Sequence, residues 1–221
     1  RITLGIEDGV NISSLSEDPL CVVVKATDKG GKYVSAEDFI AAAKAAPGDI
    51  TLAQAGTNNA NHAFAELLGI AAGVKFVNMP FDGASRVVTE IIGGHVDGGV
   101  MKPGDCLSQL LAGEVDIIGT FTRERVSILP DVPTFSELGY DVFMYGDIAM
   151  ITYIIAPKDI EPAIREVLAD MFRTVLSSDE WQTIANERAF VSNPISGDEL
   201  DAYIKGTYDG LRAASEKVFV Q

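Results

Sequence analysis

The stretch Ala55-Gly56-Thr57-Asn58-Asn59-Ala60-Asn61-His62 separates an apolar run at residues 50–53 from a helical pattern of apolar residues that begins at Phe64. A glycine followed by small polar residues at a strand-to-helix junction leaves the N–H groups of the first helical turn without intrahelical partners, at the positive end of the helix dipole. Such a junction can bind an anion. We therefore expect this loop to bind ligand oxygens through Gly56, Thr57, Asn58 and Asn59. The alternative is a capped helix start that binds no ligand.

A second junction of the same kind follows at Met79-Pro80-Phe81-Asp82-Gly83-Ala84-Ser85. Gly83 permits backbone conformations that are closed to other residues, and Ser85 offers a hydroxyl group. We expect Gly83, Ala84 and Ser85 to bind ligand oxygens, and Phe81 to form an apolar wall of the pocket. The alternative is a plain helix start with Phe81 in the core. Two such loops indicate a cleft that holds a small carboxylate rather than a catalytic centre.

Apolar runs and helical patterns alternate along most of the chain. Strand-like runs lie at residues 20–24, 50–53, 76–79, 115–121 and 148–156, and helical patterns lie at 36–46, 62–72, 84–93, 103–112 and 160–176, with a further helix start at 198–206. Strands interleaved with helices indicate βαβ units and a mainly parallel sheet. Residues 129–140 differ: prolines at positions 130 and 133 predict an extended connecting arm, followed by a short helix that Thr134 caps.

The composition fits a folded globular chain and argues against several classes of function. The 221 residues are 47% hydrophobic and 22% charged, and the formal net charge is −15. Nucleic acids and anionic membranes are polyanions, so this charge disfavours both as partners. A small anion is compatible with it, because salt screens surface charges beyond roughly 8–10 Å. No apolar run of the sequence reaches the ~18 residues that a transmembrane helix needs.

The sequence offers no convincing set of catalytic or metal-binding residues. Its two histidines, His62 and His95, and its two cysteines, Cys21 and Cys106, do not have the spacing of metal ligands. A nucleophilic site built on Cys106 has no supporting spacing either. Two cysteines are too few for a disulfide framework. We therefore expect no catalytic residue, no metal and no cofactor.

Several motifs together resemble the receptors of tripartite tricarboxylate transporters, the TctC or Bug family of solute-binding proteins. The motifs are Ala55-Gly56 with His62 and Glu66-Leu67, Pro80-Phe81-Asp82-Gly83-Ala84, Gly93-Gly94-His95-Val96-Asp97, Leu129-Pro130-Asp131-Val132-Pro133-Thr134 with Glu137 and Gly139-Tyr140, and Ala156-Pro157 with Pro162. The match extends from about Leu20 to the C-terminus, and its motifs are specific together rather than singly.

The resemblance implies an α/β fold of the type II periplasmic-binding-protein kind, with two lobes of mixed, mainly parallel sheets and a cleft between them. Residues 48–147 would form one lobe, and residues 1–47 with 148–221 would form the other. Backbone amides of the loops would hold the ligand carboxylate. The resemblance also implies a periplasmic location, a processed chain from which a signal peptide has been removed, and membrane transporter subunits as partners.

Three departures from the family pattern bear on these expectations. The family begins with several strands and helices that have no counterpart here, so we expect the first lobe to be incomplete and its exposed surface to favour a homodimer. Lys102 stands where the family has an acidic or amide residue, and it could pair with a ligand carboxylate. Ile151-Thr152 replaces a common aromatic residue, which leaves the ligand shape open.

The expected function is that of a non-enzymatic receptor that captures a small carboxylate for a tripartite tricarboxylate-type transporter. A dicarboxylate, a tricarboxylate, an aromatic acid or an amino acid would all satisfy the same loops. The alternative is a ligand-sensing domain of a signalling or regulatory system with the same fold. An enzyme of the doubly wound type would need a perturbed nucleophile or base in the cleft, and the sequence shows no candidate.

Overall fold

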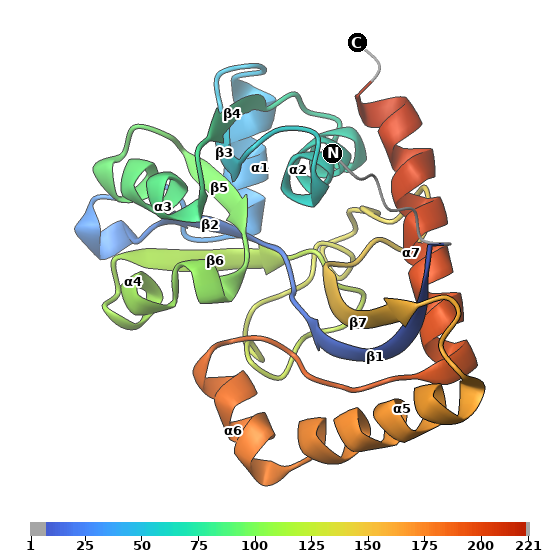
Figure 1. The fold of residues 1–221 in the computed structure, drawn as a ribbon. Helices are drawn as coiled ribbons and strands as arrows, with labels where there is room; N and C mark the ends of the chain where they lie inside the picture. The colour runs from blue at the N-terminus through green and yellow to red at the C-terminus, as the bar shows by residue number, and fades with distance from the viewer. Residues whose placement is uncertain (1–7, 220–221) are drawn as a thin grey trace.

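The computed structural model describes residues 8–219, which form two α/β units (Figure 1). The larger unit is built on a five-stranded sheet, whose strands lie in the spatial order β4 (Val77–Phe81), β3 (Thr51–Ala55), β5 (Gly98–Met101), β2 (Cys21–Lys25) and β6 (Val115–Thr120). Strand β3 is parallel to β4 and β5, whereas β2 is antiparallel to both of its neighbours. The carboxyl ends of β3, β4, β5 and β6 therefore meet at one edge of the sheet.

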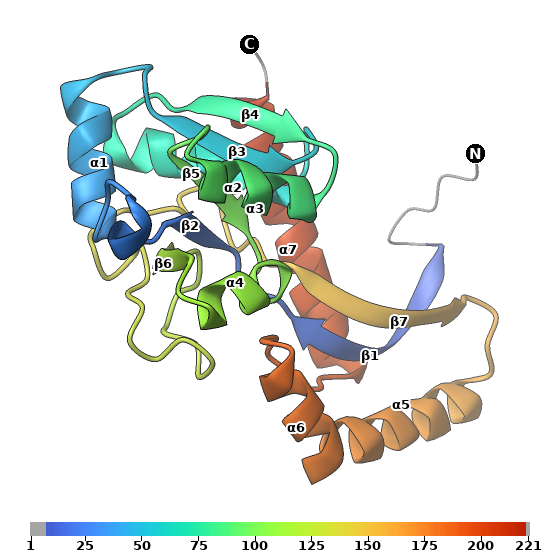
Figure 2. The same ribbon diagram turned by 90° about the vertical axis from the view of Figure 1, so that its left-hand side faces the viewer.

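Helices cover both faces of this sheet (Figure 2). One face carries α1 (Ala36–Ala45) and α2 (Ala60–Ala72), and the other carries α3 (Ala84–Gly93) and α4 (Leu107–Leu111). On the first face Phe39 and Val22 share one core cluster, and on the second Ile91 and Val23 share another. Successive residues of β2 thus enter different cores, as the alternation of side chains along a strand requires. Two short 3-10 turns, η1 (Thr27–Lys29) and η2 (Pro103–Asp105), complete the unit.

The smaller unit is built around two antiparallel strands. Its elements are β1 (Gly9–Glu17), β7 (Ile151–Pro157), α5 (Pro162–Leu176), α6 (Asp179–Glu187) and α7 (Gly197–Val218). Residues 18–20 lead from β1 into the larger unit, and residues 146–150 lead back to β7. Helix α7, red in Figure 1, extends beyond the smaller unit and lies against α2. None of the described helices is both long and apolar enough to span a membrane.

The structure bears on the division of the chain into lobes. Strand β2 lies between β5 and β6, and Phe39 of α1 packs in the same core as Leu52 of β3. A boundary after residue 47 would separate α1 from β3, although they share this core. We propose that residues 20–147 form one lobe and that the remaining described residues form the other. The first residues of the chain, on which the expectation of a removed signal peptide rests, lie outside the described part.

Several elements differ from those that the sequence predicts. Residues 9–17 form a strand that the periodicity does not predict, because its polar side chains become buried only through bonds to segment 191–195: the N–H of Ser14 donates to the carbonyl of Ile195 at 3.0 Å. The predicted helix at 103–112 is divided into η2 and α4, and the predicted strand at 148–156 begins only at residue 151. The helix start at 198–206 continues to Val218.

The connecting arm at residues 129–140 contains turns and no helix, so the short helix expected there is wrong. The predicted cap is nevertheless present. The Thr134 hydroxyl accepts a hydrogen bond from the N–H of Glu137, and the Glu137 carboxylate accepts one from the N–H of Thr134, both at 3.0 Å. The arm also joins the sheet, because Thr134 forms a parallel bridge with Thr120 at the end of β6.

Candidate ligand-binding site

The two predicted glycine loops lie side by side at the carboxyl edge of the five-stranded sheet. Ala55 at the end of β3 pairs with Phe81 at the end of β4, and the N–H of Gly56 donates to the carbonyl of Phe81 at 2.9 Å. The loops at 56–59 and 81–85 follow directly. Lys102 follows β5, the other neighbour of β3, at the same edge. Loops at this edge are where ligands bind in open α/β sheets.

Hydrogen bonds within the loop at 56–59 and to the residues that flank it hold this loop in place. Gly56 and Asn58 have positive φ angles of 84° and 53°. The Asn59 side chain caps α2, since its Oδ1 accepts from the N–H of His62 at 3.1 Å and its Nδ2 donates to the carbonyl of Ala55 at 2.6 Å. The N–H of Asn58 donates to Nδ1 of His62 at 3.2 Å. The side chain of Asn59 and the N–H of Asn58 therefore already have partners within the protein.

Free donors remain at the start of α2. Within residues 8–219, the backbone N–H groups of Ala60 and Asn61 make no hydrogen bond. They belong to the first turn of a 13-residue helix, where the orphan donors and the helix dipole act together. These two groups are consequently the ones best placed to receive an anion, one or two residues later than the sequence indicates.

The loop at 81–85 leads into α3 without a side-chain cap. Gly83 is the N-cap residue, with a φ of 89°, and its N–H donates to the carbonyl of Phe81 at 3.1 Å. A Cβ atom at Gly83 would meet nothing within 4 Å, so glycine is required here by the backbone conformation and not by lack of space. Phe81 is half-buried and packs against the core under α3. This position fits the alternative interpretation of the loop, in which Phe81 belongs to the core.

Lys102 has a partner within the protein. Its Nζ lies 2.6 Å from Oδ2 of Asp18, which belongs to the first crossing segment. The Lys102 side chain is 32% exposed and that of Asp18 is 13% exposed. A ligand carboxylate would have to displace Asp18, or bind beside it, to use this charge.

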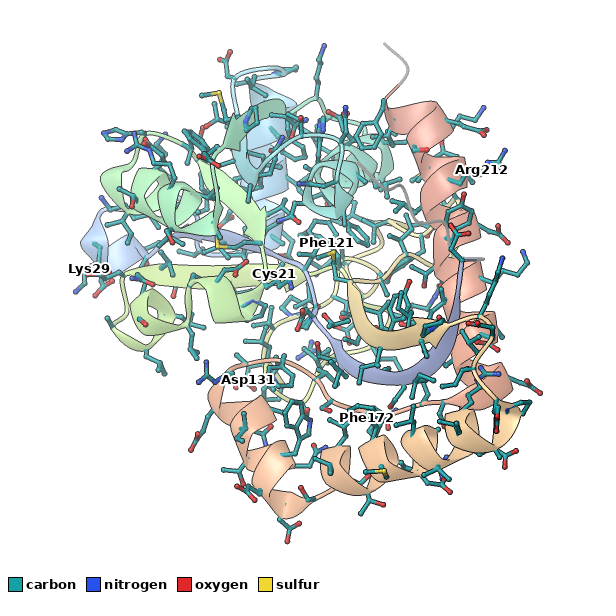
Figure 3. The ribbon with its side chains drawn as sticks, in the orientation of Figure 1. Cys21, Lys29, Phe121, Asp131, Phe172 and Arg212 are labelled. Atoms are coloured by element: carbon teal, nitrogen blue, oxygen red, sulfur yellow. The ribbon has the colours of Figure 1, made fainter. Side chains whose placement is uncertain are left out.

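Helix α7 brings further residues to the first loop. Asn58 and Asn59 line a cavity of about 340 Å³ together with Arg212 and Ser215, and with the apolar side chains of Tyr208, Leu211 and Phe219. The rings of His62 and Phe219 lie 5.0 Å apart. Arg212, labelled on α7 in Figure 3, supplies the cavity with positive charge. Sequence reasoning missed it because more than 150 residues separate it from Asn58, and no local pattern connects them.

Neither of the two cysteine thiols is activated as a nucleophile. Cys21 and Cys106 are both free and fully buried. Burial raises the pKa of both, that of Cys106 to about 12, so they are protonated at neutral pH. Among the described residues, no group of three or more His, Cys, Asp or Glu side chains is placed to hold a metal.

The chain is similar to proteins of a known family. The family model described as "Tripartite tricarboxylate transporter family receptor", TctC, matches residues 4–207. The UPF0065 protein in the TAR-I ttuE-ttuC' intergenic region of Agrobacterium vitis is 30% identical over 171 residues, which are 77% of this chain and 48% of that relative. Protein BugT of Bordetella pertussis is 27% identical over 173 residues, 78% of this chain and 51% of BugT. The chain thus spans about half the length of the curated relatives it matches.

Solved structures share the fold. Rpa4515 of R. palustris with adipate has 19% identity and a TM-score of 0.80, covering 96% of this chain and 69% of that chain. MatC of Rhodopseudomonas palustris with bound malate has 18% identity and a TM-score of 0.71, covering 93% and 69%. At these identities the likeness concerns the fold alone.

The two units, their crossing segments and the loops at the sheet edge define a type II periplasmic-binding-protein fold, with one lobe incomplete, so the predicted fold class is confirmed. The chain belongs to the tripartite tricarboxylate transporter receptor family, TctC. Members of this family are periplasmic substrate-binding receptors and not enzymes.

Proposed function

We propose that this chain captures a small carboxylate at the carboxyl edge of its five-stranded sheet and delivers it to a tripartite tricarboxylate-type transporter. One observation carries the proposal: β3 and β4 are neighbours, so the N-termini of α2 and α3 both reach the same edge. Two aligned helix starts concentrate orphan N–H donors and positive potential where a carboxylate would sit. The adipate and malate in the related structures are in keeping with such a ligand.

We propose specific roles for the residues at this edge. Ala60 and Asn61 donate their N–H groups to one carboxylate oxygen pair, and Arg212 balances the charge from α7. The remaining contacts that we propose are Gly56, Thr57, Asn58, Asn59, Gly83, Ala84 and Ser85, with Phe81, which also packs against the core under α3, as the apolar wall. Lys102 contributes only if the ligand carboxylate displaces Asp18 or binds beside it.

Binding would close the two lobes around the ligand. The lobes are joined by the short segments at 18–20 and 146–150, which can act as hinges because few backbone angles need to change there. The transporter would then recognise the closed form in the periplasm. A receptor of this kind needs no catalytic group.

The proposal also includes a weak homodimer through α5. Four side chains on one face of this helix are 48–60% exposed: Ile164, Val167, Met171 and Val175. Two antiparallel copies of α5, related by an axis between residues 169 and 170, would bring Glu166 opposite the partner's Arg173. The apolar face and the charges beside it are thus complementary to a second copy.

A thermal-shift screen of the chain against small carboxylates tests the receptor function. A ligand at about 100 times its dissociation constant stabilises the folded state by about 2.7 kcal/mol, which raises the melting temperature of a domain this size by a few degrees. Succinate, malate, adipate and citrate are suitable first compounds. If none of a broad panel of acids shifts the melting temperature, carboxylate capture is refuted for this chain.

A further inference from the structure

A second cavity, of about 430 Å³, lies between the two units. Its walls come from both crossing segments and from α7, and three phenylalanine rings line it: Phe64, Phe121 and Phe143. Phe121 is labelled in Figure 3, near the middle of the molecule where the units meet. The cavity is large enough for one end of a small organic ligand.

The charged groups of this cavity are mainly negative. Glu17, Asp18 and Asp147 line it, and among the described residues Arg123 is its one cationic side chain. Asp18 pairs with Lys102 at 2.6 Å, and Asp147 pairs with Arg123 at 2.5 Å. Within residues 8–219, Glu17 has no ion-pair partner. The Glu17 carboxylate, which is exposed and hydrogen-bonded to the Tyr203 hydroxyl, therefore carries a charge that no cation of the described residues balances.

Tyr203 also lines this cavity, and the Glu17 charge affects the pKa of its hydroxyl. Burial, followed by the neighbouring Glu17 carboxylate, raises the pKa of the Tyr203 hydroxyl well above its ordinary value, and Asp147 adds to the effect. The negative potential therefore reaches the part of the cavity that α7 lines. A ligand carboxylate placed there would be repelled, whereas an ammonium group would be attracted by Glu17 and by the faces of the aromatic rings.

This cavity lies close to the anion site at the start of α2. Helix α7 lines both: Tyr203, Gly206 and Thr207 face the cavity between the units, and Tyr208, Leu211 and Arg212 face the cavity at Asn58 and Asn59. Leu211 lies four positions after Thr207, which is about 6 Å along a helix. The start of α2 also connects the two cavities. Asn59 lines the cavity at Asn58 and Asn59, and Phe64, five positions later, lines the cavity between the units.

We propose that the natural ligand carries an ammonium group as well as a carboxylate. The cavity between the units binds the ammonium beside Glu17, and the start of α2 with Arg212 binds the carboxylate. The inference rests on the proposed capture of a carboxylate and narrows its ligand class, from small carboxylates in general to zwitterions whose two charges lie several bonds apart.

Calorimetric titration of the chain with adipate and with 6-aminohexanoate tests the proposal. The two compounds have nearly the same length, and an ammonium in one replaces a carboxylate in the other. We expect 6-aminohexanoate to bind about tenfold more tightly, in a buffer free of primary amines. Glu17→Gln should reduce this ratio to near one. Glu37→Gln, which removes an equal charge from the exposed start of α1, should leave the ratio unchanged.

The outcomes separate this inference from the function on which it rests. If adipate binds as tightly as 6-aminohexanoate, or more tightly, the ammonium site is overturned while carboxylate capture stands. If the preference survives in Glu17→Gln with an unchanged melting temperature, the cavity does not recognise the ammonium and the inference is likewise overturned. If neither compound nor any other acid binds, both proposals fail together.

Discussion

Thr51 and Asp97 exchange three hydrogen bonds at the amino ends of β3 and β5. The N–H and the hydroxyl of Thr51 donate to Oδ2 of Asp97 at 3.0 and 2.8 Å, and the N–H of Asp97 donates to the Thr51 hydroxyl oxygen at 2.8 Å. Lys32 and Tyr33 donate to the other carboxylate oxygen at 2.9 and 3.0 Å. This cluster joins two central strands at the edge of the sheet opposite the two glycine loops, so it helps to fix how these strands lie beside each other.

We expect Asp97→Asn to lower the free energy of unfolding by about 1–3 kcal/mol at pH 7, because several charge-assisted bonds weaken together. Burial alone would raise the pKa of Asp97, but the hydrogen bonds from Lys32, Thr51 and Tyr33 outweigh it and hold the pKa below its ordinary value. The folded state therefore binds the proton less readily than the unfolded state. The stabilisation is fully present above the unfolded pKa of about 4 and is lost as the pH falls through the lower folded pKa.

Urea denaturation of the wild type and of Asp97→Asn at pH 7 and at pH 3 measures this effect. The difference between the two proteins should be smaller at the lower pH. An equal difference at both values would show that the carboxylate charge does not contribute.

Gly83 should be intolerant of any other residue. Its φ of 89° is costly for a residue with a Cβ atom, although that atom would have free space. Gly83→Ala should therefore lower the free energy of unfolding by about 1–2 kcal/mol through backbone strain. It should also weaken carboxylate binding, because relief of the strain displaces the start of α3.

Gly206→Ala is the matched control for Gly83→Ala. Gly206 lies inside α7, where a Cβ atom also has free space but no positive φ is recorded. There the same substitution should stabilise the protein by about 0.5–1 kcal/mol. Thermal unfolding of both variants separates the two cases, and a stabilising Gly83→Ala would contradict the role of this backbone conformation.

Arg212→Gln should weaken the binding of carboxylates about tenfold, because the cavity at Asn58 and Asn59 would lose its cation. Its present partner is Glu216, at 3.7 Å and with both side chains largely exposed, so stability should change by less than about 0.5 kcal/mol. Calorimetric titration with the tightest ligand of the panel measures the loss. Arg173→Gln on α5 is the control, and equal losses in both variants would point to a general effect of net charge.

Helix α5 should mediate weak self-association. Sedimentation velocity at increasing protein concentration is expected to show a monomer–dimer equilibrium. Glu166→Arg should weaken the dimer by charge repulsion with the partner's Arg173, and the double variant Glu166→Arg/Arg173→Glu should restore it. A chain that stays monomeric at the highest concentrations would rule out the α5 dimer.

Sequence patterns within short stretches were sufficient to predict much of the fold. Ser35 caps α1, since its Oγ accepts from the N–H of Asp38, three positions later, at 3.2 Å. The Thr134 and Glu137 cap is present as well. The alternation of apolar runs and helical patterns was enough to identify an α/β chain, because such periodicity reflects which face of each element is buried.

The sequence by itself therefore determined the class of fold, most helix starts and the two glycine loops that follow β3 and β4, because these depend on bonds between residues a few positions apart. Only the tertiary structure decided that residues 9–17 form a strand, that Lys102 pairs with Asp18, and that Arg212 reaches Asn58. Each of these depends on partners 80 or more residues away. Which distant groups meet is set by the path of the whole chain and the packing of its cores, and no local pattern contains that information.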